Sequence, residues 1–83
     1  MSSYLVFSNL RANLSLEELN EILEQTGPSD RTDVELIHEA TSSVAMIRVP
    51  WQTSIATSVA QKLNGTVHKG HKITVHATSE FSE

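Results

Sequence analysis

The basic side chains toward the C-terminal end of the chain are the first place where the sequence could do chemistry. Lys69, His71, Lys72 and His76 form the only basic grouping in the sequence. Lysine ammonium groups bind phosphate oxygens, and imidazoles add charge as the pH falls toward ~6.5. Solvated surface is the default role of such residues. If the chain binds an anion such as nucleic acid, we expect the phosphates to lie here.

Metal binding and catalysis are not expected from the sequence. His68 and His71 have a spacing that two metal ligands can adopt, but no third ligand is evident nearby. The chain has no cysteine, no glycine-rich phosphate loop and no paired carboxylates with a histidine partner in the expected context. We therefore predict that the protein is not an enzyme and uses no metal and no cofactor.

Charge is unevenly distributed along the 83 residues, which carry a net charge of −4. Residues 1–40 hold eight acidic side chains against two arginines, whereas residues 41–83 hold four lysines and arginines against two glutamates. The acidic balance argues against tight, non-specific binding of nucleic acid, because that affinity comes mainly from lysine and arginine on phosphates. Without cysteine, a basic leader or an apolar run of about 20 residues, we expect an intracellular protein with no membrane contact.

Two helices are predicted to position these residues. The first follows Ser15, which can cap the first turn while Glu18 completes a capping box, and it ends at Gly27. Its predicted apolar stripe consists of Leu16, Leu19, Ile22 and Leu23. The second helix runs from about residue 53 or 54 to Leu63 and ends at an Asn-Gly pair.

Four strands are predicted from alternating apolar residues: residues 4–10, 33–39, 43–49 and 71–77. The order of elements is then strand, helix, strand, strand, helix, strand. That order predicts an α+β, ferredoxin-like βαββαβ sandwich, with a four-stranded antiparallel sheet and both helices on one face. The expected order across the sheet is fourth, first, third, second strand. Residues 1–78 would form a single domain, followed by a polar tail, 79–83.

Three segments resemble the RNA recognition motif (RRM). "LVFSNL" is similar to the first-strand signature of that family, "SSVAMIRV" falls where the family has its third-strand octamer, and "VAQKLNGTVHKGHKITVHA" resembles its closing pattern. The resemblance implies that single-stranded RNA lies on the open sheet face, where the family stacks bases on aromatic rings. The positions of those rings carry Val6, Val44 and Met46. Losing two stacks would weaken binding by ~2 to 6 kcal/mol.

Two functions therefore follow from the sequence. The first is weak or atypical binding of single-stranded RNA by an RRM-type domain, through Tyr4, Val6, Val44, Met46, Arg48, Lys69, Lys72 and His76. The alternative is a protein-protein interaction module that uses the apolar sheet face or Trp51, through Ile37, Met46, Trp51 and Phe81. A monomer is favoured. Neither the RNA sequence nor the protein partner can be inferred from the residues.

Overall fold

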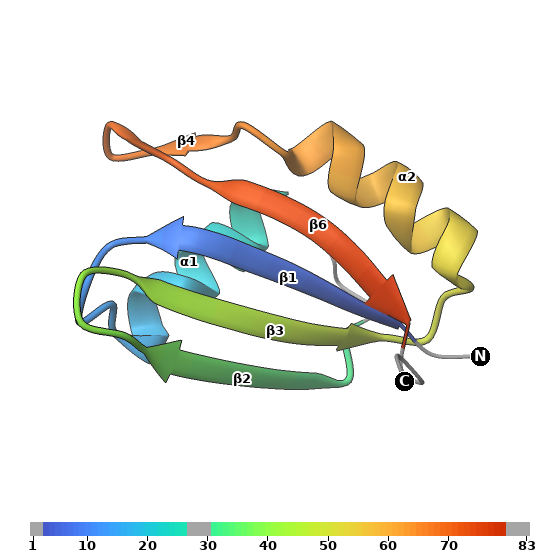
Figure 1. Ribbon diagram of the computed structural model, residues 1–83, viewed down its shortest axis with the longest axis horizontal. Coiled ribbons are helices and arrows are strands. Elements are labelled where there is room, and N and C mark those ends of the chain that lie inside the picture. Colours follow the sequence, from blue (N-terminus) through green and yellow to red (C-terminus); the bar gives the residue numbers. More distant parts are fainter. Residues whose placement is uncertain (1–2, 27–30, 80–83) are drawn as a thin grey trace.

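The computed structural model describes residues 3–26 and 31–79, which form a sheet, two helices and a small hairpin (Figure 1). The elements are β1 (Ser3–Leu10), α1 (Leu16–Thr26), β2 (Asp33–His38), β3 (Ser43–Val49), α2 (Thr53–Leu63), β4 (Val67–His68), β5 (His71–Lys72) and β6 (Thr74–Ser79). The main sheet is antiparallel and has the order β2-β3-β1-β6. This is the predicted ferredoxin-like arrangement, with the first and third strands of the chain in the middle.

Alternation along the strands separates a core face from an open face. In β3, Ala45, Ile47 and Val49 are fully buried, whereas Val44 and Met46 are only half-buried. The helices cover the core face: α1 lies behind the sheet in Figure 1, and α2 follows its β6 edge. Within residues 3–26 and 31–79, both helices lie on the core face and none covers the opposite face, as the sequence predicted.

A β-bulge near the end of β1 keeps the core continuous. Phe7 pairs with Ala45, and the next registered pair is Leu10 with Ser43, so β1 carries one extra residue between them. Asn9 takes up the irregularity with a left-handed backbone (φ 61°), which asparagine tolerates better than most residues. As a result Phe7 and Leu10, three positions apart, are both buried.

Helix α1 begins at a side-chain cap. The Glu18 backbone N–H donates to Ser15 Oγ at 3.1 Å, as the capping motif predicts. The Glu18 carboxylate accepts a hydrogen bond from the Arg11 guanidinium. The prediction that Leu16 belongs to the apolar stripe was wrong, because its side chain is 56% exposed. Leu14, just before the helix, is buried and fills this end of the core.

The segment between α2 and β6 differs most from the prediction. Residues 71–77 were expected to form one strand, but His71–Lys72 pairs with Val67–His68 in a separate hairpin, and β6 begins at Thr74. Ile73 explains the break: its N–H donates to the Thr66 carbonyl at 2.8 Å, and its own carbonyl accepts from Gly65 N–H at 2.9 Å. These bonds tie residue 73 to the segment after α2.

The Leu-Asn-Gly sequence at the end of α2 holds this segment against the sheet. Asn64 Oδ1 accepts a hydrogen bond from the Val75 backbone N–H at 2.9 Å. Gly65 follows with φ 89°, a left-handed conformation that favours glycine.

Among the described residues, no helix is long and apolar enough to cross a membrane.

Candidate functional site

Side chains from all four strands of the main sheet gather on the open face. The register fixes how they are placed: Val6 lies between Met46 on β3 and His76 on β6. Tyr4 is paired with Arg48 in the neighbouring row. Directly paired residues on one face have Cβ atoms about 4.5–5.5 Å apart, so these five side chains form one continuous surface.

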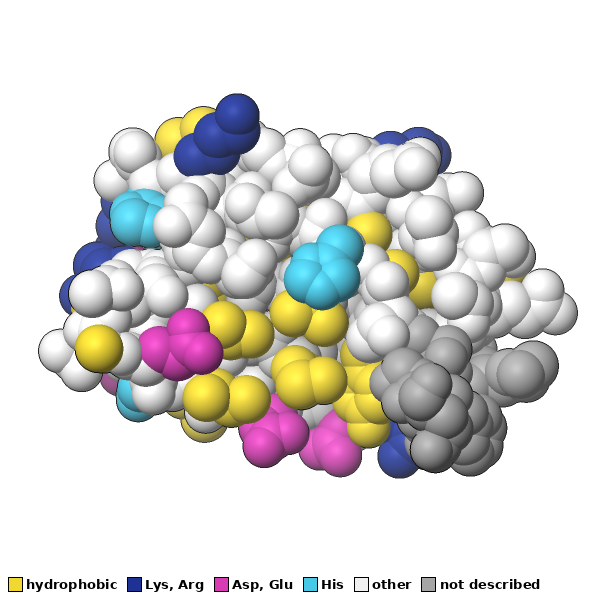
Figure 2. Space-filling model, viewed as in Figure 1, with side chains coloured by type: hydrophobic (Ala, Val, Ile, Leu, Met, Phe, Trp, Pro, Cys, Tyr) yellow, Lys and Arg dark blue, Asp and Glu magenta, His cyan; other side chains and the backbone are white. Residues whose placement is uncertain are grey.

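The middle of the open face is apolar. Val6, Val44 and Met46 are half-buried, and Ile37 of β2, which pairs with Val44, is 40% exposed. Figure 2 shows hydrophobic side chains gathered over the centre of the sheet, with a histidine beside them. Contiguous exposed apolar surface often marks a binding site, whereas single exposed apolar residues are normal.

One edge of the open face is acidic. On β2, Asp33 pairs with Arg48 and Glu35 pairs with Met46, and both carboxylate side chains are exposed. Figure 2 shows acidic side chains along this edge of the face, below the hydrophobic ones. An anionic ligand is therefore repelled at the β2 edge and meets the open face more favourably toward β6, which contributes His76.

The positions that carry aromatic rings in the RRM family hold aliphatic side chains here. Val6, Val44 and Met46 all lie on the open face, where their side chains offer apolar contact but no ring. Among residues 3–26 and 31–79, Tyr4 is the aromatic residue on this surface, one row away from Val6, and it is half-buried. The open face can therefore contact the flat side of a base through methyl groups and one displaced ring.

Both lysines that were predicted to bind RNA lie off the open face. Lys72 is in the hairpin strand β5, where its carbonyl accepts from Asn9 Nδ2 at 2.7 Å, and its side chain is exposed. Lys69 lies in the hairpin turn and its Nζ is 4.0 Å from Glu21 Oε1 of α1. Lys69 is therefore directed to the helix side of the domain, away from the other predicted residues.

The residues proposed to contact a protein partner do not all lie on one surface. Ile37 and Met46 lie on the open face. Trp51 follows β3 and is half-buried against the core, and its carbonyl accepts from Ser3 Oγ at 3.0 Å. Phe81 lies outside the described residues. Ile37 and Met46 thus share one surface, whereas Trp51 packs against the core.

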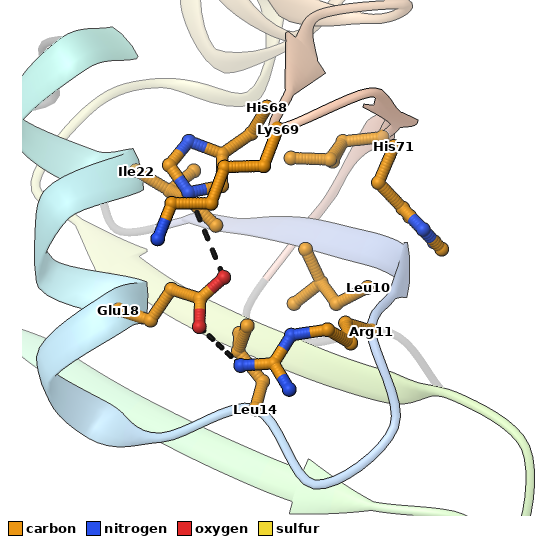
Figure 3. A pocket seen from close by; sticks show the side chains of 9 residues that line it. Leu10, Arg11, Leu14, Glu18, Ile22, His68, Lys69 and His71 are labelled. Carbon is orange, nitrogen blue, oxygen red and sulfur yellow. Dashed lines mark hydrogen bonds and ion pairs between the residues drawn. The ribbon is translucent and has the colours of Figure 1, made fainter.

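A polar cluster on the helix side was not foreseen from the sequence. Arg11 Nη2 donates to Glu18 Oε1, and Glu18 Oε2 lies 3.7 Å from His68 Nε2 (Figure 3). The hydrogen bond from the Arg11 guanidinium holds the pKa of the Glu18 carboxyl below its usual value of 4.5. His68 Nδ1 lies 3.1 Å from Gln25 Oε1. Within residues 3–26 and 31–79, no group of three or more histidines and carboxylates could hold a metal ion.

The element order, the strand order and the open face together define the fold of an RNA recognition motif. A solved structure with this fold is the MEC-8 C-terminal RRM domain bound to AGCACA. It is 20% identical to this chain, with a TM-score of 0.66, and the match covers 99% of this chain and 94% of that one. The sequence matches no protein-family model and has no significant match among curated proteins.

Proposed function

We propose that this domain binds short single-stranded RNA on its open face, with lower affinity than a domain of the same fold that carries aromatic rings there. The observation that carries the proposal is the continuous, accessible apolar surface formed by Val6, Val44 and Met46 on the uncovered side of the sheet. The MEC-8 domain, which has the same fold, is bound to AGCACA. The proposed activity is binding, without a catalytic step.

The contacts would be mainly apolar. A base laid over Val6 and Met46 loses water from its flat side and from the methyl groups beneath it, and Tyr4 in the next row supplies one ring. Each missing aromatic stack costs ~1 to 3 kcal/mol. With two stacks absent, a complex that would otherwise be micromolar weakens at least about thirtyfold, to a Kd of ~30 μM or above.

Charge sets the orientation of the bound strand. Asp33 and Glu35 repel phosphates at the β2 edge, whereas His76 on β6 and Lys72 in the hairpin attract them. The phosphate backbone would then run along the β6 side while the bases point toward the middle of the sheet. Because few cations take part, the affinity should fall only modestly with salt compared with strongly basic RNA-binding proteins.

A protein partner is the second candidate for the same face. The acidic edge formed by Asp33 and Glu35 beside the exposed Ile37 favours it, because a partner with a basic rim and an apolar centre would complement this surface. Such a partner would compete with RNA for Met46. The two candidates are therefore distinguished by whether RNA alone shifts the signals of the open face.

The test is an NMR titration of the ¹⁵N-labelled domain with a pool of short single-stranded RNAs at low salt. Binding on the open face predicts saturable shifts at amides 4–8, 44–48 and 74–78. The shifts should saturate only at higher RNA concentration in Tyr4→Ala, and be unchanged in Thr57→Ala on the exposed surface of α2. An absence of shifts at millimolar RNA would refute the proposal and leave the protein partner as the candidate for this face.

A further inference from the structure

A small pocket lies on the helix side of the domain, between α1, the end of β1 and the β4–β5 hairpin (Figure 3). Its volume is about 110 Å³. We call it the α1–hairpin pocket. Its floor is made of four aliphatic side chains that are almost completely buried: Leu10, Leu14, Ile22 and Ile73.

The rim of the α1–hairpin pocket is mainly basic. Arg11, Lys69 and His71 line it and are exposed. Arg11 is paired with Glu18, and Lys69 lies 4.0 Å from Glu21. The Lys69–Glu21 pair joins two exposed side chains and is therefore weak, so Lys69 can turn toward an incoming carboxylate at little cost. Arg11 stays with Glu18, whose side chain is only 13% exposed, and can use its remaining N–H groups for a ligand.

His68 adds a buried polar atom that lacks a partner. The residue is only 9% exposed, and its Nδ1 lies 3.1 Å from Gln25 Oε1. An amide oxygen only accepts hydrogen bonds, so His68 Nδ1 donates to Gln25 Oε1. Nε2 has no hydrogen-bond partner in the described part of the chain, and it lies 3.7 Å from Glu18 Oε2. His68 Nε2 is thus a buried polar atom beside the Glu18 carboxylate, too far from it for a hydrogen bond.

We propose that the α1–hairpin pocket binds one aliphatic side chain of an acidic peptide segment from a partner protein. The volume fits, because a cavity of about 150 Å³ holds a benzene molecule and this pocket is somewhat smaller. The floor suits a leucine or valine side chain. The aliphatic floor offers no hydrogen-bond partner to the polar edge of a nucleobase placed against it, whereas an aliphatic side chain needs none. This proposal does not rest on RNA binding at the open face.

A peptide also supplies a hydrogen-bond partner for the buried polar atom and carboxylates for the basic rim. Its backbone carries N–H and C=O groups next to every side chain. It can therefore supply a hydrogen-bond partner to His68 Nε2, which is covered in the free domain, once the rim opens slightly. Acidic residues on either side of the aliphatic one would meet Arg11 and Lys69. The pocket faces the helix side, so this peptide and a ligand on the open face could be bound together.

The test uses the ¹⁵N-labelled chain and the peptide acetyl-Glu-Asp-Leu-Asp-Glu-amide. Binding in the pocket predicts saturable shifts at amides 10–14, 18–22 and 68–73, with the open face unaffected. The same peptide with serine in place of leucine should fail to saturate. Lys69→Glu should weaken binding by about fivefold or more, since it removes one attraction and adds a repulsion. Lys62→Glu, the same charge change on exposed α2, should leave binding unchanged.

Several outcomes would overturn the proposal. Equal binding of the leucine and serine peptides would show that charge alone attracts the peptide and that the floor is not used. Shifts in the pocket with short RNA but not with peptide would assign the pocket to nucleic acid. If no saturable shifts appear at millimolar peptide, the pocket does not bind an acidic peptide. If Lys69→Glu does not fold, Lys69→Gln removes the same attraction without adding a repulsion, and Lys62→Gln is its matched control.

Discussion

Replacing Val6 with tyrosine should strengthen the binding of single-stranded RNA to the open face. Val6 lies in the centre of this surface, between Met46 and His76, and is half-buried, so a larger side chain can lie over the sheet without entering the core. Aromatic residues suit strands. The substitution therefore restores a ring at a position where the RRM family stacks a base, and it changes little else.

The expected gain follows from one added stack. Stacking a base on an aromatic side chain contributes ~1 to 3 kcal/mol, which corresponds to a Kd about 5 to 150 times lower. The lower part of this range applies if the new ring partly packs on Met46 or His76, its neighbours across the sheet, instead of on the base.

Fluorescence anisotropy with a labelled short RNA at low salt measures this change. The matched control is Ile55→Tyr, which adds the same ring at an exposed position of α2, far from the open face, and should leave the Kd unchanged. Thermal melts of both variants confirm that each is folded. If folded Val6→Tyr binds RNA no better than the unmodified domain, or if Ile55→Tyr gains as much, bases do not stack on the open face and the reasoning fails.

Two further predictions concern the contacts that hold the fold. Asn64→Ala removes the acceptor of the buried Val75 N–H and should lower the free energy of unfolding by ~1 to 3 kcal/mol in urea titrations, whereas Asn64→Asp keeps an acceptor and most of the stability. The hydrogen bond from Arg11 lowers the pKa of Glu18 in the folded state below 4.5. The ionised Glu18 should therefore stabilise the fold fully above pH 4.5, and this stabilisation should be lost as the pH falls through the folded-state pKa. Urea titrations at several acidic pH values should show a shallower pH dependence for Glu18→Gln.

Each of these predictions has a clear contrary outcome. Equal losses of stability in Asn64→Ala and Asn64→Asp would mean that the hydrogen bond to Val75 does not explain the asparagine after α2. A Glu18→Gln variant whose stability changes with acid as steeply as that of the unmodified chain would mean that other carboxyl groups account for the acid sensitivity.

The sheet and both helices could be predicted because their periodicities are strong. In β3 the alternation of Ala45, Ile47 and Val49 with half-buried neighbours is the period-two pattern of a strand with one core face. Helix α2 has the predicted bounds, from Thr53 to Leu63. The same alternation predicted which residues lie on the open face, because shifting the register of β3 by one residue would place Ala45 and Ile47 on that face.

The hairpin and the helix-side cluster could not be predicted because nothing periodic encodes them. Strands of two residues, such as His71–Lys72, are too short to show alternation, and the left-handed Lys69 in their turn is not a residue that favours this conformation. Glu18 and His68 are fifty residues apart in the sequence, and only the packing of the hairpin against α1 brings them together. Gly70, with φ 79°, was the local signal of the turn.

The most direct test of RNA binding on the open face is a set of intermolecular nuclear Overhauser effects in the complex with a short single-stranded RNA. Binding as proposed predicts contacts from base protons to the methyl groups of Val6, Val44 and Met46, because these side chains form the centre of the face. Contacts from the RNA only to the hairpin around Lys69 and Lys72, with none to these methyl groups, would contradict it.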